Sequence, residues 1–430
     1  MSYFHLNLIL QGKLTVCCLL MLSAMPLNAQ REAKQIGDFK ESISLNEHLR
    51  GTKRTLQYRP DGDEFVCVNG KNRYTRALYG SHSPFRVETS DRPVFAFYNN
   101  GRGGNISFKV ILRDGTELAL DCTGHCESRY SAGKRTYYLT DPSWGKGELR
   151  ISVLALADMD GAIWRFSPSN MPKGAILRWQ HGGTTGKRLS RNGDMGVDPA
   201  DCFELPAEAT DLVTGELPLQ KEVYLVRGEV PEGYNVRKLY QQAEAASLAL
   251  ASHLKIETPD PYLNTLGGAL VAAADGIWDG QVWLHGAIGW RMPLSGWRAG
   301  YTGDALGWHD RARTHFDAYA ASQVTDVPNT IPHPAQDSTM NLARSEKRWG
   351  TPQYSNGYIC RNPERNNQMH HYDMNLCYMD ELLWHFNWTG DTAYVRKMWP
   401  VITRHLAWEK LNYDPDNDGL YLSLIHISEP

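Results

Sequence analysis

The sequence predicts a multidomain β + α protein: an N-terminal β-sandwich followed by a truncated (α/α)6 toroid. Two observations predict this order. Short strands with alternating apolar and polar residues fill about 38–231, and from Tyr262 onward the apolar residues recur with a helical period. The predicted helices are joined alternately by short turns and by long aromatic loops, which is typical of an α/α toroid. A closed toroid has twelve helices and the sequence supplies about four, so we expect only its first third.

The predicted sandwich spans residues 30–232. Its clearest alternation runs from Ile106 to Leu112 and is followed by the turn Asp114-Gly115. Leu118 and Leu120 belong to the returning strand. Further strands are predicted at 64–68, 93–98, 136–139, 149–156, 162–166 and 222–226.

An Ala-rich helix is predicted within a helical linker at 233–258. Its apolar positions share one face and are Leu239, Ala243, Ala246, Leu250 and Leu254. The third of the toroid then occupies 259–421. Its helices are predicted at 262–274, 303–322, 373–388 and 391–411, and Asp391 is the predicted N-cap of the last one.

The composition is that of a globular protein. Of 430 residues, 42% are hydrophobic and 22% are charged, which excludes disordered, collagen-like and multi-span membrane proteins. A net charge of −3 provides no basic field for nucleic acid. Tryptophan is unevenly distributed, since ten of the 13 lie between Trp278 and Trp408. We assign this excess to the loops of the toroid.

Both ends are predicted to lie outside the fold. Lys13, the apolar run 14–27 and Ala29 have the order of a secretory signal peptide covering 1–29. We therefore expect a secreted or periplasmic protein with no transmembrane span after cleavage. Residues 422–430 resemble translated sequencing adapter, so we interpret the chain as a gene fragment and expect it to be inactive and poorly stable.

The cysteines allow more than one state. Export makes disulfides possible. Cys122 and Cys126 have a spacing that metal sites also use, but no second ligand pair stands nearby. We predict a hairpin disulfide or free thiols here rather than a metal.

The segment 284–310 is the main candidate for a functional site. It combines flat aromatic faces, guanidinium donors and carboxylates in a glycine-rich stretch, a combination that suits the apolar faces and hydroxyl rims of sugars. The predicted substrate-binding residues are Trp290, Arg291, Trp297, Arg298, Tyr301 and Trp308, and the predicted catalytic residues are Asp304 and Asp310. An alternative role for Asp304 is to cap a helix that begins at Ala305.

Two further polar clusters follow. We predict that His370, His371, Asp373 and Asn375 bind substrate hydroxyls, because no complete set of zinc ligands accompanies them. Glu381 is interpreted as a solvated helix residue rather than a catalytic one. Asp414, Asp416 and Asp418 match early positions of a calcium loop. No cofactor is expected to be required. The loop has two interpretations, a Ca²⁺ site and a plain Asp-rich turn.

These residues resemble a known superfamily. Gly300-Tyr-Thr-Gly-Asp304, the hairpin 384–402 and Asp414-Pro-Asp-Asn-Asp-Gly-Leu420 are similar to motifs of the six-hairpin glycosidases, over about 260–421. The front half is similar to the domain of unknown function 4450 of secreted bacterial proteins. The nearest characterised relatives implied are family 142 glycoside hydrolases, β-L-arabinofuranosidases that act on complex pectin.

The resemblance carries a role over to one residue only. In the related rhamnosidase pattern a Gly-Trp-Thr-Gly-Asp stretch lies in the active site, and Asp304 matches its Asp, with Tyr301 in place of Trp. A catalytic Glu stands seven residues earlier in that pattern, where this sequence has Trp297. Asp310 is a substitute candidate without support from the motif.

The resemblance implies a glycoside hydrolase that acts on oligosaccharides or polysaccharides of plant or host origin. Such hydrolysis usually uses two carboxyl groups, one as acid and one as base or nucleophile. We expect the second carboxylate to lie beyond this sequence. Two alternatives remain: an enzyme like the disaccharide phosphorylases, which share this architecture, and a non-catalytic glycan-binding protein.

Overall fold

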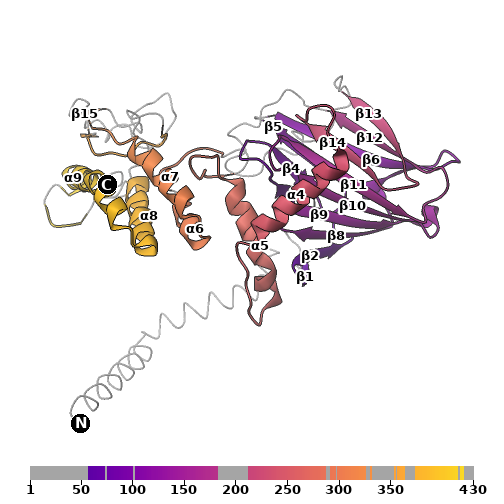
Figure 1. Cartoon of the computed structure of the whole chain (residues 1–430), viewed down its shortest axis with the longest axis horizontal. Coiled ribbons are helices and arrows are strands. Elements are labelled where there is room, and N and C mark those ends of the chain that lie inside the picture. The colour runs from indigo at the N-terminus through magenta and orange to yellow at the C-terminus, as the bar shows by residue number, and fades with distance from the viewer. Residues whose placement is uncertain are drawn as a thin grey trace, which may run out of the picture. The chain divides into compact units, whose positions relative to one another are not determined.

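The computed structural model describes residues 57–72, 75–99, 102–182, 212–286, 291–296, 298–325, 330–331, 353–354, 356–363, 373–414 and 417–420. All of these except Gln57 belong to one unit, Tyr58–Pro430. The order of elements in this unit is strands first and helices second, which confirms the coarse β-then-α architecture (Figure 1).

The strands form two antiparallel sheets. The first sheet has the order β1-β2-β8-β9-β10-β11-β14 and the second β13-β12-β6-β5-β4-β3, with β7 paired to β6. The strands of the first sheet are β1 (Arg59–Asp61), β2 (Glu64–Val68), β8 (His125–Ser131), β9 (Lys134–Thr140), β10 (Glu148–Ala155), β11 (Gly161–Ser169) and β14 (Val223–Gly228). Those of the second are β3 (Arg76–Leu78), β4 (Arg86–Thr89), β5 (Phe95–Asn99), β6 (Arg102–Ile111), β7 (Glu117–Ala119), β12 (Ile176–Gly182) and β13 (Val213–Pro218).

Aromatic side chains join the two sheets. Phe95 of β5 meets Tyr137 of β9 and Trp164 of β11 edge to face, with ring centroids 5.7 and 5.6 Å apart. All three are fully buried. Such edge-to-face pairs add about 0.5–1.5 kcal/mol each beyond the area they bury. The predicted sandwich therefore has a real inter-sheet core.

Helices follow the sandwich. They are α4 (Val236–Ala251), α5 (Pro261–Gly276), α6 (Gly300–Ala305), α7 (His309–Ala320), α8 (Asp373–Thr389) and α9 (Thr392–Tyr413). Two 3-10 turns, η1 (Leu120–Cys122) and η2 (Pro142–Trp144), and a two-stranded ladder of β15 (Thr330–Ile331) and β16 (Gln353–Tyr354) complete the elements. Helix α4 lies against β10, β11 and β14 of the first sheet (Figure 1).

The predicted helices are found with shifted ends and one break. Asp391 caps α9 as predicted, because its carboxylate accepts hydrogen bonds from the amides of Ala393 and Tyr394. The predicted helix 303–322 is instead two helices, separated at Gly307, whose φ of 73° ends α6. On α4, Leu239 and Ala243 are buried, but Ala246 is exposed, contrary to the predicted apolar face.

The structure also describes the state of the two paired-spacing cysteines and the membrane-spanning potential of the helices. Cys122 and Cys126 are free thiols, the first exposed and the second buried. Within the described part of the chain, no helix has the length and apolar character that crossing a membrane requires.

Candidate functional site

The site is built where α6 meets α8. Asp304, in the last turn of α6, is buried, with 4% of its surface exposed. Its two carboxylate oxygens each lie 2.9 Å from Nδ1 of His385 on α8, and Oδ1 lies 2.7 Å from Nδ1 of His309. Asp304 therefore caps no following helix and instead joins α6 to α8 through imidazole hydrogen bonds.

A second carboxyl group lies one helical turn earlier on α8. Glu381 is 1% exposed, and its Oε2 accepts a hydrogen bond of 3.2 Å from the amide of Gly300, the first residue of α6. Its Oε1 is buried with no hydrogen-bond partner among the described residues. Burial raises the pKa of Glu381 to about 8. The interpretation of Glu381 as a solvated helix residue is therefore wrong.

Glycine at position 300 makes this approach possible. A Cβ added there would lie 2.4 Å from Oε2 of Glu381, closer than any side chain tolerates. Just before it, Arg298 has a positive φ of 63°, an uncommon backbone conformation for a residue other than glycine. The chain thus turns sharply so that its backbone amides face the Glu381 carboxyl.

Tyr301 and Asp380 lie beside the buried pair. The Tyr301 hydroxyl donates a short hydrogen bond to Oδ2 of Asp380. Desolvation, together with the Asp380 carboxylate, raises the pKa of Tyr301. Arg298 is exposed. Of the predicted substrate-binding residues, Tyr301 therefore lies beside Glu381 through its bond to Asp380, and Arg298 stands two residues before Gly300.

Other predicted residues lie in different surroundings. Trp308 is 8% exposed, and the guanidinium of Arg311 covers its ring at 4.4 Å, so its face is not open. Arg291 donates a hydrogen bond of 2.5 Å to the carbonyl of His82, in the sandwich. Asp310 is exposed in the first turn of α7.

Asn375 is fully buried, and both ends of its amide are engaged. Its Oδ1 accepts from the amide of Ile359 at 2.6 Å, and its Nδ2 donates to the carbonyl of the same residue at 3.0 Å. This geometry favours a structural role over the predicted contact with a substrate hydroxyl. Asp373 begins α8. Four predicted residues lie outside the described part of the chain, namely Trp290, Trp297, His370 and His371.

The proposed calcium loop contains ordinary turn contacts. Oδ1 of Asp414 accepts from the amide of Gly419 at 3.4 Å, and Oδ1 of Asp418 accepts from that of Leu420 at 2.7 Å. Asp416 lies outside the described residues. Among those that are described, no three His, Cys, Asp or Glu side chains are grouped so that they could hold a metal ion. Calcium binding stays a prediction.

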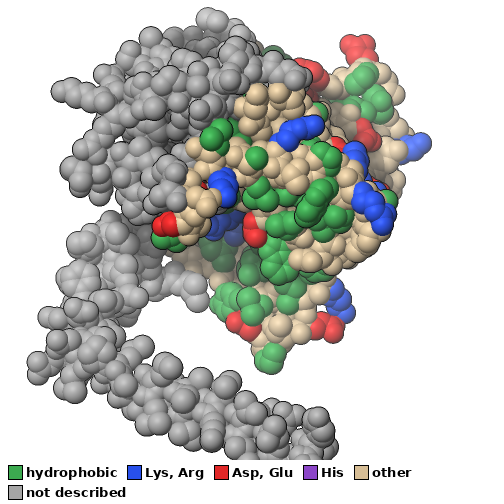
Figure 2. Space-filling model, turned by 90° about the vertical axis from the view of Figure 1, so that its left-hand side faces the viewer, with side chains coloured by type: hydrophobic (Ala, Val, Ile, Leu, Met, Phe, Trp, Pro, Cys, Tyr) green, Lys and Arg blue, Asp and Glu red, His purple; other side chains and the backbone are tan. Residues whose placement is uncertain are grey.

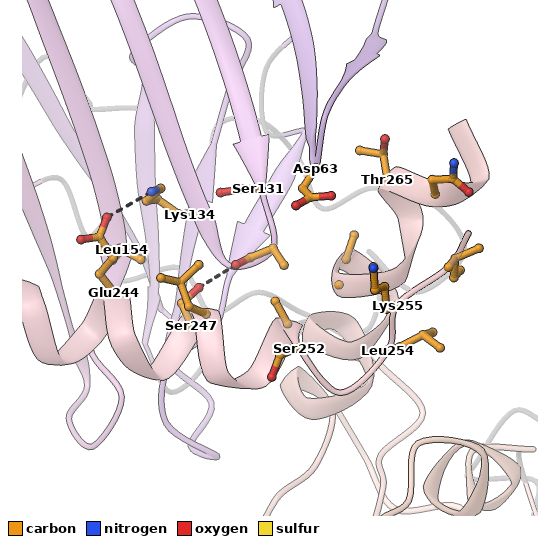
Figure 3. Close-up of a pocket in the computed structure, with 17 residues that line it drawn as sticks. Asp63, Ser131, Lys134, Leu154, Glu244, Ser247, Ser252, Leu254, Lys255 and Thr265 are labelled. Carbon is orange, nitrogen blue, oxygen red and sulfur yellow. Dashed lines mark hydrogen bonds and ion pairs between the residues drawn. The ribbon is translucent and has the colours of Figure 1, made fainter. Parts of the chain in front are cut away.

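Among the residues that the structure describes, two of the cavities lie between the sandwich and the helices. The larger, about 360 Å³, is shown in Figure 3. Its polar side chains bond to their neighbours: Lys134 pairs with Glu244 at 3.1 Å, and Ser247 donates to the carbonyl of Ala132 at 2.6 Å. Neither cavity is lined by Asp304 or Glu381.

Comparison with known proteins supports the front half of the resemblance. The family model described as a domain of unknown function (DUF4450) matches residues 100–227, which contain β6 to β13 and most of β14. No curated protein matches the chain. The finer resemblance to family 142 receives no support from these comparisons.

One solved structure similar to the chain is the crystal structure of a bacterial glucoamylase complexed with acarbose. The alignment covers 75% of this chain and 60% of that one, with 8% identity and a TM-score of 0.42. The chain thus spans about 60% of the length of that glucoamylase. A likeness of this size supports no conclusion about activity.

Proposed function

We propose that the protein is a glycoside hydrolase acting on complex glycans, with Glu381 as the general acid and Asp304 as its partner carboxylate. The observation that carries the proposal is the environment of Glu381. Burial raises its pKa to about 8, so at neutral pH it holds the proton that a leaving sugar oxygen needs. A raised pKa in a catalytic acid is the pattern by which enzymes keep a carboxyl protonated near pH 7.

Asp304 is also buried, but its polar neighbours differ. Two imidazole nitrogens lie within 2.9 Å of its oxygens, whereas Glu381 contacts a backbone amide. Two carboxyl groups in contrasting surroundings are the recurring basis for separating acid from base or nucleophile. This contrast supports the proposal that Asp304 and Glu381 form the catalytic pair.

Helix geometry supports the spacing of the pair. Gly300 contacts Glu381, and Asp304 contacts His385. The second contact therefore lies four residues beyond the first on both α6 and α8. Four residues rise roughly 6 Å along a helix axis. Paired carboxyls of glycosidases lie about 5 to 9.5 Å apart, and a separation set by this helix rise supports the proposal that the two groups act on one substrate.

The experiment measures the turnover of a panel of plant and host oligosaccharides by the purified protein. We expect Glu381→Gln and Asp304→Asn each to lower kcat by roughly 10²-fold or more, the usual contribution of a positioned acid or base. Glu148→Gln, at an exposed carboxyl on β10, is the control and should retain full turnover.

Each alternative has its own outcome. If Glu381→Gln keeps more than about a third of the activity, Glu381 is not the acid, and a large loss in Asp310→Asn would move that role to Asp310. Strict dependence on phosphate would identify a phosphorylase. Glycan binding without turnover would identify a binding protein.

A further inference from the structure

The smaller cavity, about 300 Å³, lies between the sandwich and the helices, away from Asp304 and Glu381. The sandwich contributes the turn that follows β3, the β8–β9 turn and the end of β10, and helices α4, α5 and α7 close the other sides. Much of its wall is small and apolar, from residues such as Ala155, Ala243, Ala246 and Ala272. Its charged side chains come from different segments and gather at one end.

Asp275 of α5 organises that charged end. Its Oδ1 lies 2.6 Å from Nη1 of Arg311 on α7 and 3.2 Å from Nε2 of His82 in the turn after β3. Burial alone would raise the pKa of Asp275, but hydrogen bonds from His82 and Arg311 hold it below its ordinary value. The carboxylate therefore stays ionised and orients both donors.

Arg311 is held rigidly and still reaches the cavity. Its guanidinium lies 4.4 Å from the ring centroid of Trp308 and 5.7 Å from that of Trp278. Among the described residues only Nη1 is engaged, by Asp275, and 27% of the side chain is exposed. A guanidinium fixed in this way loses little conformational entropy when it binds a planar ligand.

His82 and His253 complete the donor set. The His82 side chain is 39% exposed, and only its Nε2 is engaged within the described part of the chain. His253 lines the same cavity and packs against Trp308, with ring centroids 5.5 Å apart. Three nitrogen-bearing side chains therefore border the space around one carboxylate that is already paired.

The neighbouring cavity in Figure 3 makes the contrast clear. There Lys134 and Glu244 pair with each other, and Ser247 bonds to the β8–β9 turn. In the smaller cavity Nη2 and Nε of Arg311 and the second nitrogen of His82 have no hydrogen-bond partner among the described residues. A pocket with apolar walls and a few converging polar groups is the usual form of a small-molecule site.

We infer that this cavity binds a small organic carboxylate through Arg311, and through His82 in its imidazolium form, in which Nε2 donates to Asp275 and Nδ1 is free to donate to the ligand. A guanidinium fork matches the two oxygens of a carboxylate, and the small apolar wall accommodates a short carbon chain. The site is separate from the Asp304 and Glu381 pair, so it is tested independently of the proposed hydrolase activity.

Calorimetric titration of the full chain with acetate and succinate tests the inference. We expect saturable binding that D-glucose and inorganic phosphate do not reproduce. Arg311→Lys keeps the charge but removes the fork and should raise Kd at least about tenfold, which corresponds to about 1.4 kcal/mol. Arg313→Lys is the matched control on the same helix, because Arg313 pairs with Asp391 instead, and it should leave Kd unchanged.

Several results would overturn the inference. These are no saturable binding of either acid, an unchanged Kd in Arg311→Lys, and binding of phosphate or glucose as tight as that of succinate. Thermal melting of each variant checks folding. If Arg311→Lys does not fold, His82→Gln at the half-exposed imidazole serves as the second variant, and its Kd should rise at least about threefold.

Discussion

At the residue scale, two buried acids with contrasting surroundings are the main feature of this chain. Asp304 lies between imidazoles. Glu381 lies against a backbone amide, and its other oxygen has no partner among the described residues. The sequence motif predicted Asp304 as a candidate. Glu381 was missed because its burial depends on Gly300, 81 residues away, and no local pattern on α8 reports that contact. Its only sequence signal is a carboxyl four residues before His385 on the same helix face.

The pKa of Glu381 predicts a pH-dependent stability. In the folded chain that pKa is raised from 4.5 to about 8. The stability that the protonated group contributes is therefore complete below about pH 4.5 and is lost as the pH rises through about 8. Glu88, whose burial raises its pKa to about 7, adds a smaller change of the same sign.

Urea unfolding at about pH 5 and about pH 8.5 checks this prediction, and Glu381→Gln isolates the group. The wild type should lose on the order of a few kcal/mol more than the variant between these pH values. Asp310→Asn, at an exposed carboxyl, should behave like the wild type in this measurement. Equal pH dependence in Glu381→Gln and wild type would contradict a raised pKa at Glu381.

At the element scale, α6 is a short helix whose two ends are both held by α8. The sequence predicted one continuous helix at 303–322, since its helical period runs through this region. The helix is interrupted at Gly307, where a positive φ stops α6. The first residue of α6, Gly300, is fixed by its contact with Glu381. Glycines in the sequence can suggest where a helix is interrupted. The residue that packs against the helix is needed to tell which glycine interrupts it.

Two glycine substitutions separate these contributions. In Gly300→Ala the new Cβ would meet Oε2 of Glu381 at 2.4 Å, so we expect a loss of about 1–3 kcal/mol in the free energy of unfolding. Gly307→Ala meets nothing within 4 Å, and backbone strain alone should lower stability by about 1 kcal/mol. Turnover should fall in Gly300→Ala and persist in Gly307→Ala. Turnover that survives Gly300→Ala would argue against Glu381 as the acid.

The cap of α9 is a prediction that the sequence alone supplied. Asp391 accepts hydrogen bonds of 3.0 Å from the amides of Ala393 and Tyr394 and also pairs with Arg313. Asp391→Ala should lower the midpoint of urea unfolding by an amount equivalent to about 1–2 kcal/mol. Asp391→Asn keeps the cap and should recover most of this loss, whereas equal losses in both variants would assign the effect to the ion pair.

At the scale of the whole molecule, the sandwich was the most predictable part. Alternation with a period of two, punctuated by glycine, asparagine and proline turns, located β2, β5, β6, β9, β10, β11 and β14 within a few residues. It did not reveal β12, whose partner β13 follows only after residues 183–211. The connection between sandwich and helices was also not predictable, because it depends on single contacts such as Nη2 of Arg86 to the carbonyl of Gly276 at 2.6 Å.

The outer faces of α8 and α9 remain strongly apolar. Trp384 and Trp388 on α8 are 51% and 57% exposed, and Trp399 on α9 is 56% exposed. Exposed leucines accompany them, namely Leu376, Leu383, Leu406 and Leu411. Figure 2, which looks onto the side that carries these helices, shows hydrophobic side chains at the surface. Patches of this kind mark surfaces that another element or partner covers.

This face predicts how the 430-residue chain behaves in solution. It should bind an apolar fluorescent dye and should sediment faster as its concentration rises. Replacing Trp384, Trp388 and Trp399 together by Gln should lower dye fluorescence at least about threefold, while Tyr234→Gln, at an exposed aromatic residue elsewhere, should not. Equal dye binding by the triple variant and the wild type would show that the dye reports another surface.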